Sequence, residues 1–241
     1  MKNEGTENTK LLLTSAGIIS ILLGVLPLAG FQLLGKYGYP ELIRESPKVI
    51  LESIYQARNV IPYLYYAGVG GAGLCVIFLS ILMGIILNNA GEKTLSELGK
   101  YCGIINGLCL YGGILRWTFL FPKLAEFRAL GTYDTETIDL VFKSFNTYVG
   151  DTIAEHVGFT FMFLWVLFFS IALIKTKVIT KWLGFSGIGL CLLVLYGNLE
   201  FFGVPGAFIA NRLAAELVAV WAMLLGINLI LKRNTAFSDK P

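Results

Sequence analysis

Charged residues are scarce in this sequence: they make up 15% of its 241 residues, whereas 56% of the residues are hydrophobic. A soluble domain carries about 25% charged residues because its whole surface meets water. The charges here are confined to short islands, and the apolar segments between them reach the length of about 20 residues that crosses a bilayer. The composition therefore predicts an integral membrane protein. The net charge of +3 is too small to indicate a nucleic-acid partner.

Histidine and paired cysteines are also scarce. The single histidine, His156, excludes bis-histidine haem and argues against a histidine-rich zinc site or a multi-histidine iron centre. The four cysteines all fall in apolar segments and form no CxxC pair, so we expect them to pack as small apolar residues. They are Cys75, Cys102, Cys109 and Cys191. The sequence accordingly predicts no disulfide framework, no metal site and no cofactor.

Six transmembrane spans follow from the apolar segments, at about Leu11–Leu34, Pro62–Leu87, Gly99–Phe121, Gly150–Ile174, Gly184–Val204 and Ala207–Leu231. The first span is too long for the core of a signal peptide and lacks a small-residue cleavage site, so we expect it to be retained. Lys and Arg concentrate in the two tails and in the turn at 175–182. This distribution predicts a multi-pass protein of the inner (plasma) membrane with both termini in the cytoplasm.

The predicted fold class is all-α, a six-span transmembrane helix bundle with two amphipathic extracytoplasmic linker helices. A single transmembrane domain over 11–231 is expected between cytoplasmic tails at 1–10 and 232–241, with outward-facing linkers at 35–61 and 122–149. In the first linker, Ser46 is a favourable N-cap and Pro47 a favourable first helical residue. In the second, apolar residues recur at helical spacing, namely Ile138, Val141, Phe142, Phe145, Tyr148 and Val149. Such helices are expected on the outer membrane face or over the mouth of the bundle.

Glycine clusters lie inside the predicted spans. The stretch GVGGAG at Gly68–Gly73 contains the letters of a dinucleotide-binding fingerprint, but that fingerprint works only between a strand and a helix. Within a membrane span, small residues instead allow close approach of two helices. Gly99, Gly103 and Gly107 form a similar small-residue face on the third span. Both clusters are predicted to serve helix packing.

Polar residues inside the spans fall near one predicted depth, close to the outer ends. Besides Asp151 and Asn211, this layer contains the ligand-binding candidates, which are Arg116, Glu155, His156, Asn198, Glu200, Arg212 and Glu216. An ionisable group near the bilayer centre costs about 2.5–3.5 kcal/mol, so such groups usually face a partner or water. Arg116 and Arg212 are the expected partners of Glu155, Glu200 and Glu216. We therefore predict a polar cavity that opens outward under the two linker helices.

The second half of the chain resembles a known family of bacterial membrane proteins, grouped as domain of unknown function 4386. The resemblance is carried by KTKVITKWLGFSGIGLCLLVLYG at Lys175–Gly197 and by AAELVAVWAMLLGINL at Ala214–Leu229. The family motifs correspond to Trp182-Leu183-Gly184 at the start of the fifth span and to Glu216, Trp221 and Gly226 in the sixth. The helix at Pro47–Asn59 and Arg116 fit the same pattern. The resemblance implies a six-span topology and no particular activity.

Three functions are compatible with these features. The first is binding or transport of a small amphiphile or lipid, with membrane lipid as a partner, in the outward-facing polar cavity. The second is an intramembrane enzyme acting on lipid headgroups, with Asp151 or Glu155 as a base, His156 as an acid or base, and an arginine as a phosphate clamp. The third is a scaffold or accessory subunit in which the charges form structural pairs. The catalytic residues, the ligand and the oligomeric state stay open.

Overall fold

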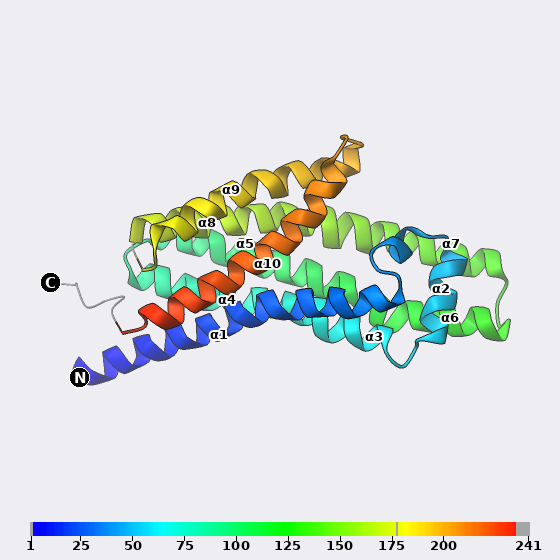
Figure 1. Cartoon of the computed structure of the whole chain (residues 1–241), viewed down its shortest axis with the longest axis horizontal. Helices are drawn as coiled ribbons and strands as arrows, with labels where there is room; N and C mark the ends of the chain where they lie inside the picture. Colours follow the sequence, from blue (N-terminus) through cyan, green and yellow to red (C-terminus); the bar gives the residue numbers. More distant parts are fainter. Residues whose placement is uncertain (1, 177, 235–241) are drawn as a thin grey trace.

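The computed structural model describes residues 2–176 and 178–234, and most of its helices lie along one long axis (Figure 1). Six helical segments in this described part are long and apolar enough to cross a membrane. They are Glu7–Tyr37, Ile61–Asn89, Lys93–Leu130, Thr135–Thr176, Lys181–Phe202 and Ala207–Lys232. Each overlaps one predicted span, so the all-α six-span fold class is confirmed. The chain is a multi-pass membrane protein.

Short 3₁₀ or π segments, labelled η, connect or extend the α-helices. In chain order the elements are α1 (Lys2–Leu34), η1 (Gly35–Tyr37), η2 (Glu41–Arg44), α2 (Pro47–Gln56), α3 (Ile61–Leu64), η3 (Tyr65–Gly70), α4 (Gly71–Asn89), α5 (Lys93–Leu115), η4 (Arg116–Leu120), α6 (Phe121–Leu130), α7 (Thr135–Phe145), η5 (Asn146–Val157), α8 (Gly158–Thr176), α9 (Lys181–Gly197), η6 (Asn198–Phe202) and α10 (Ala207–Lys232). Ser46 precedes α2 as its N-cap and Pro47 is its first residue, as predicted.

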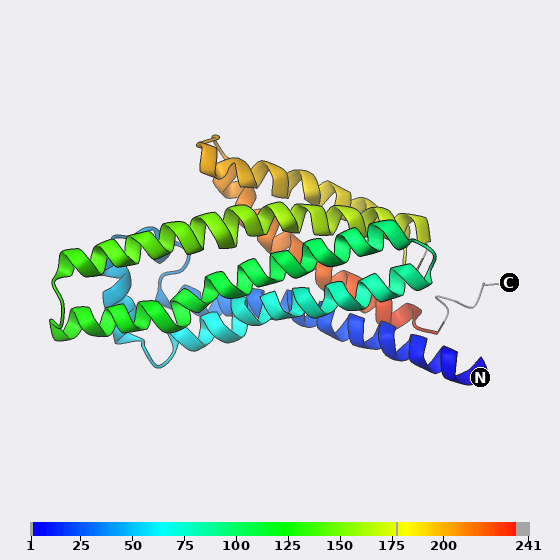
Figure 2. The ribbon, with the colours of Figure 1, turned by 180° about the vertical axis from the view of Figure 1, so that it is seen from behind.

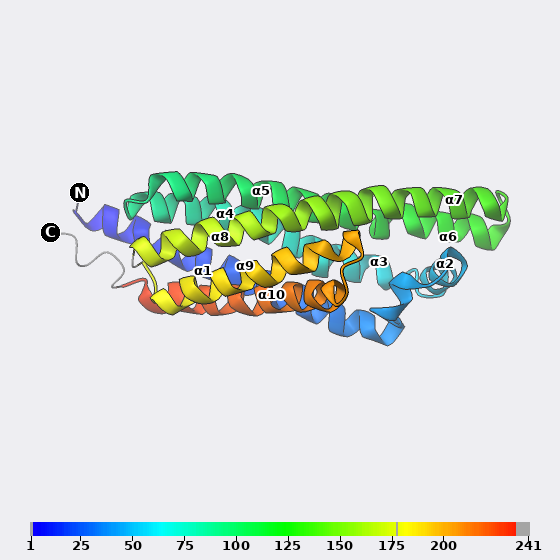
Figure 3. The same ribbon diagram turned by 90° about the horizontal axis from the view of Figure 1, so that it is seen from above.

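The six membrane helices form a closed ring. Helix α1 packs on α4, α4 on α5, α5 on α8, α8 on α9, α9 on α10, and α10 returns to α1 (Figures 1 and 3). The core inside the ring is centred on Trp165 and Phe169 of α8, with Trp221 of α10 beside them. The start of α1 and the end of α10 lie at the same end of the bundle (Figure 1). That this end is cytoplasmic stays a prediction.

Glycine sets the closest helix contacts, as the sequence predicted. Gly30 of α1 lies against Gly68 of η3, where an added Cβ on Gly68 would stand 3.0 Å from the Cα of Gly30. In the same way, an added Cβ on Gly73 would stand 3.0 Å from the carbonyl oxygen of Gly107. Backbone atoms cannot move aside as a flexible side chain can, so any larger residue would separate these helices.

The motif residues of the second half hold the last three helices together. The Trp221 indole on α10 donates a hydrogen bond to the backbone oxygen of Leu183 on α9 at 2.9 Å. An added Cβ on Gly184 would lie 2.8 Å from the carbonyl oxygen of Ser170 on α8. On the opposite side of α10, Gly226 touches α1, where an added Cβ would meet the Gly17 oxygen at 2.5 Å. These residues are therefore packing determinants.

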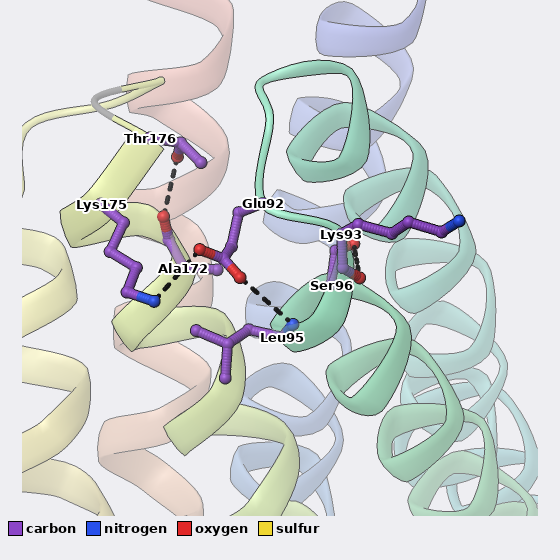
Figure 4. A network of polar contacts seen from close by, with 7 residues as sticks. All are labelled: Glu92, Lys93, Leu95, Ser96, Ala172, Lys175 and Thr176. Carbon is purple, nitrogen blue, oxygen red and sulfur yellow. Dashed lines mark hydrogen bonds and ion pairs between the residues drawn. The ribbon is translucent and has the colours of Figure 1, made fainter.

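An ion pair ties two turns at the end of the bundle that carries the termini. Glu92, in the turn between α4 and α5, accepts a hydrogen bond from the Leu95 backbone N–H and so caps the N-terminus of α5 (Figure 4). Its second carboxylate oxygen lies 3.2 Å from the Lys175 ammonium at the end of α8. One side chain thus joins the second, third and fourth spans at this end.

The second linker differs from the prediction. Instead of a separate helix, α5–η4–α6 and α7–η5–α8 form two long rods joined by a turn at 131–134, and this hairpin projects past the α9–α10 end (Figure 2). Helix α2 packs against α6 and α7. The shared core includes Ile138 and Phe142, whereas Phe145 and Tyr148 of the predicted stripe are exposed. Phe145 is the last residue of α7, and Tyr148 lies in the π segment that begins at Asn146, where the regular 3.6-residue spacing no longer holds.

The α1–α10 crossing provides a stability test. Gly226→Ala is expected to lower the melting temperature in detergent, because the new methyl would overlap the Gly17 backbone oxygen and overpacking costs about 1–3 kcal/mol. Gly189→Ala on α9 is the matched control, since its added Cβ would meet no atom within 4 Å. The control should melt at or above the wild-type temperature because alanine favours the helix. Equal melting of the two variants would contradict this packing.

Candidate functional site

A cavity of about 510 Å³ lies between the membrane core and the second core beneath α2. Segments from all along the chain contribute to its wall, from α1 to α10. Its charged lining residues are Arg44, Arg116, Asp151, Glu155, Glu200, Arg212 and Glu216. Its aromatic lining residues are Phe31, Tyr39, Tyr65, Trp117, Phe159, Phe201 and Phe208. The wall is therefore both charged and aromatic.

Three π-helical segments of the described chain, η3, η4 and η5, all meet at this cavity. A π turn pairs each N–H with the carbonyl five residues earlier, which widens the helix and occurs often at functional sites. Segment η3 supplies Tyr65, η4 supplies Arg116 and Trp117, and η5 supplies Asp151 and Glu155. The irregular backbone of the bundle is thus concentrated at its most polar pocket.

Arg116 is buried, with 8% of its surface exposed. Its Nη1 donates to the carbonyl oxygen of Gly113 at 2.6 Å and its Nε donates to Asn146 Oδ1 at 3.3 Å. Its guanidinium lies against Gly150, where an added Cβ would stand 2.3 Å from Nη2. The sequence predicted a carboxylate partner, and that was wrong: in the described residues both acceptors of Arg116 are uncharged. No carboxylate of the described residues forms an ion pair with the guanidinium, although Glu155 and Asp151 lie close enough to act on it electrostatically.

Glu200 is the centre of a cross-linked group at the end of α9. Its two carboxylate oxygens accept from Arg44 Nη2 at 3.2 Å and from Asn211 Nδ2 at 2.8 Å. The Arg44 guanidinium also lies 3.7 Å from the ring centre of Phe208. The predicted pairing of Glu200 with Arg116 or Arg212 was wrong, because the first linker folds back and brings Arg44 to it. Glu200 thereby joins the first linker to α10.

Arg212 and Glu216 form the predicted pair on one face of α10, with 3.3 Å between Nε and Oε1. Their side chains are 54% and 40% exposed, so the pair itself contributes at most about 1 kcal/mol to stability. Both residues line the cavity.

Asp151 and Glu155 line the cavity and make no hydrogen bond or ion pair with any described residue. A third acceptor shares this property. Asn211 is 7% exposed, and because its Nδ2 faces Glu200, its buried Oδ1 is left without a partner among the described residues. Polar atoms this deeply placed are normally paired. The acceptors that the cavity offers to an occupant are therefore the carboxylates of Asp151 and Glu155, whereas the Asn211 oxygen has almost no accessible surface.

His156 and Asn198 do not line the cavity. Asn198 Nδ2 donates to Thr160 Oγ1 at 2.9 Å, which turns its Oδ1 toward His156. The imidazole Nδ1 then donates to that oxygen at 3.1 Å, and the ring edge packs on Phe201 and Phe202. These two candidates thus hold the end of α9 against η5, while the other five candidates lie at the cavity.

Tyr39 forms part of the wall contributed by the first linker. Its ring stacks on Phe31 with 5.0 Å between centroids, and Tyr65 stacks on Trp117 at 4.6 Å. Burial, together with the negative field of Glu155, raises the pKa of Tyr39 to about 12. The phenol therefore stays protonated at neutral pH and can donate a hydrogen bond.

Comparison with known proteins identifies the family. A model of the family described as "Domain of unknown function (DUF4386)" matches residues 16–232. The chain belongs to this family. No curated protein and no solved structure shows significant similarity to it. Of the residues that carry the resemblance to this family, Arg116 and Glu216 line the cavity, whereas Leu183, Gly184, Trp221 and Gly226 pack the helices of this DUF4386 chain.

The predicted roof over the cavity was wrong in this DUF4386 protein. Neither α2 nor α7 contributes a lining residue; the wall from the first linker is instead Tyr39, Pro40, Ile43 and Arg44. Sequence reasoning missed Arg44 because it stands outside the spans among mixed charges. Tyr39 next to Pro40 gave a turn signal but no indication of depth. Asn146 was also missed because it stands in the predicted linker.

A double-mutant cycle tests the anchoring of Arg116. Arg116→Met and Asn146→Leu should each destabilise the protein, and their effects should be non-additive by about 1 kcal/mol or more because they share one charge-assisted hydrogen bond. Melting temperatures and denaturant midpoints in detergent measure this coupling. Arg116→Met combined with Lys143→Ala, an exposed change on α7, is the control pair and should be additive. Additivity in both pairs would rule out the Arg116–Asn146 bond.

Proposed function

We propose that this protein binds, and in doing so stores or transports, a small amphiphile or lipid in the cavity lined by Arg116, Glu155 and Trp117. The observation that carries the proposal is a lining that is aromatic and charged at once, in which the carboxylates of Asp151 and Glu155 are not paired with any described residue. An amphiphile has the complementary composition, because its apolar body covers aromatic surface while its head pairs with polar groups. The cavity volume of about 510 Å³ also falls in the range of small-molecule sites.

The position of the cavity supports access from one side. Its lining includes the segments that follow α1 and α9 and the first part of α10, which lie away from the bundle end with the termini. If the termini are cytoplasmic, as the distribution of Lys and Arg predicts, the ligand enters from the outer side.

Binding accounts for the site better than the two alternatives. An enzyme acting through His156 needs the imidazole at the cavity, whereas this ring bonds Asn198 outside the lining. A scaffold explains the Arg212–Glu216 pair and the glycine contacts, but it gives no role to the unmatched carboxylates of Asp151 and Glu155. Binding requires no reacting group and uses those carboxylates directly.

Filling the cavity tests the proposal. Ala215 lines the cavity from α10, so Ala215→Trp is expected to exclude the ligand without removing a polar contact. Native mass spectrometry of protein purified in mild detergent should show a discrete bound species on the wild type. That species should be reduced at least about fivefold in Ala215→Trp, since a bulky ring in a preformed pocket competes directly for its volume.

Leu217→Trp is the matched control. Leu217 lies on the same helix, is 43% exposed and does not line the cavity. It should retain the bound species, and both variants should melt within a few degrees of the wild type. Equal retention of the species by the two tryptophan variants would show that any bound amphiphile lies elsewhere on the protein.

A further inference from the structure

The part of the cavity wall that the first linker supplies lies between two anchored helices and is itself loosely packed. Resting on the proposed function, we propose that residues 39–44 form a hinged lid over the mouth of the cavity, and that Arg44 is the latch that keeps the lid closed. Such a lid sets how fast an amphiphile enters and leaves, so the inference concerns the regulation of this site.

The mouth of the cavity is marked by the wall residues that are exposed. Four of the described wall residues are exposed, namely Arg44, Phe201, Phe208 and Arg212. Phe201 belongs to η6, whereas Phe208 and Arg212 belong to the start of α10. The cavity therefore reaches the surface between the first linker and the corner that joins α9 to α10. Arg44 is the member of this group that comes from the linker.

Both ends of the lid are anchored, and the lid joins α1 to α2 (Figure 1). The end of α1 is held where Gly30 meets Gly68. Helix α2 is held by Leu51 and Ile54, which are buried in the second core. Directly before the lid stands Gly38, whose φ of +91° is a conformation open mainly to glycine. A hinge at this position lets the lid swing while both anchors stay in place.

The lid has little packing of its own. No residue from 35 to 46 is buried. Segment η1 packs on α1 and η2 packs on α2, which are their neighbours in the chain. The ring of Tyr39 stacks on Phe31 of α1, and Leu42 and Ile43 are only partly buried against the second core. Few buried contacts mean that local opening costs little free energy.

Across the mouth, the lid is held by Arg44. Its Nη2 lies 3.2 Å from Glu200 Oε1, and its guanidinium carbon lies 3.7 Å from the ring centre of Phe208. In the described chain, no other residue of the lid makes a hydrogen bond, ion pair or ring contact with α9, η6 or α10. The Arg44 side chain is 52% exposed, and exposed ion pairs and cation–π contacts are weak. The closure is therefore readily broken and re-formed.

Modification of a thiol placed inside the cavity tests the lid. Ala215→Cys introduces the thiol at the wall, and peptide mass spectrometry follows its reaction with the water-soluble anion sulfonatoethyl methanethiosulfonate. Adding Arg44→Ala should raise the rate of modification about tenfold, because this rate follows the population of the open state. A tenfold change corresponds to about 1.4 kcal/mol. Loss of a positive charge by itself slows an anionic reagent, so a faster reaction reports opening.

Arg58→Ala is the matched control. Arg58 belongs to the same linker and also lies over a ring, that of Tyr55 at 4.8 Å, but it does not line the cavity. Its removal should leave the rate of modification at the cavity unchanged. A second thiol, introduced by Leu140→Cys where the native side chain is 66% exposed, should react equally fast with and without Arg44→Ala. Equal rates there exclude general unfolding.

The outcomes separate the lid from the proposed function. An unchanged rate at the cavity thiol after Arg44→Ala overturns the latch, whether that thiol reacts rapidly or not at all. Equal acceleration by Arg58→Ala also overturns it. These rates do not depend on a bound species, so they leave the proposed function to the test with Ala215→Trp. Accelerated modification together with no bound species in the wild type overturns the proposed function alone.

Hydrogen exchange decides the question if Ala215→Cys does not fold. The amides of Leu42 and Glu45 donate hydrogen bonds within the linker, to the oxygens of Gly38 and Leu42. Arg44→Ala alone should speed exchange in the peptide that covers 39–45 about tenfold, since opening bends the chain at the hinge. The amides of α2 should exchange as in the wild type, because that helix stays in the second core. Equal exchange of 39–45 in the two proteins overturns the lid.

Discussion

Close backbone contact between the first and last membrane helices is the constraint on which the rest of this structure depends. Lipid tails are as apolar as the helices, so association in a bilayer relies on packing and not on the hydrophobic effect. Gly17 and Gly226 let α1 and α10 approach until a single added carbon would overlap backbone. This contact closes the ring of six helices. It also holds the C-terminal half of α10 against α1.

The cavity exists because two cores meet without merging. The membrane core is built around Trp165 and Phe169, and the second core around Phe121 and Phe142 beneath α2. Charged groups fill the junction between them because they cannot enter either core unpaired. Arg116 is held there by the uncharged acceptors Asn146 and Gly113. The site is thus a consequence of packing as well as of polar residues.

The sequence alone predicted the six spans and the glycine contacts between helices, because both follow from the types of residue that stand along a regular helix. It was also sufficient for the Arg212–Glu216 pair, because residues four apart on one helix are neighbours. It failed where the chain leaves regular geometry. The partner of Glu200 is Arg44, which is distant in the chain and reaches it only through the fold of the first linker. The depth of Asn211 and the isolation of His156 from the cavity likewise depend on tertiary contacts.

The long π segment η5 joins α7 to α8 and lets the buried faces of these two helices point in different directions around their common axis. In an uninterrupted α-helix every residue advances by a fixed angle, so the face that α7 turns to α2 would dictate the face that α8 turns to the bundle. The wider turns of Asn146–Val157 change that angle. Helix α7 can therefore bury Ile138 and Phe142 in one core while α8 buries Trp165 and Phe169 in the other. One continuous rod in this way serves two cores whose packing directions are independent.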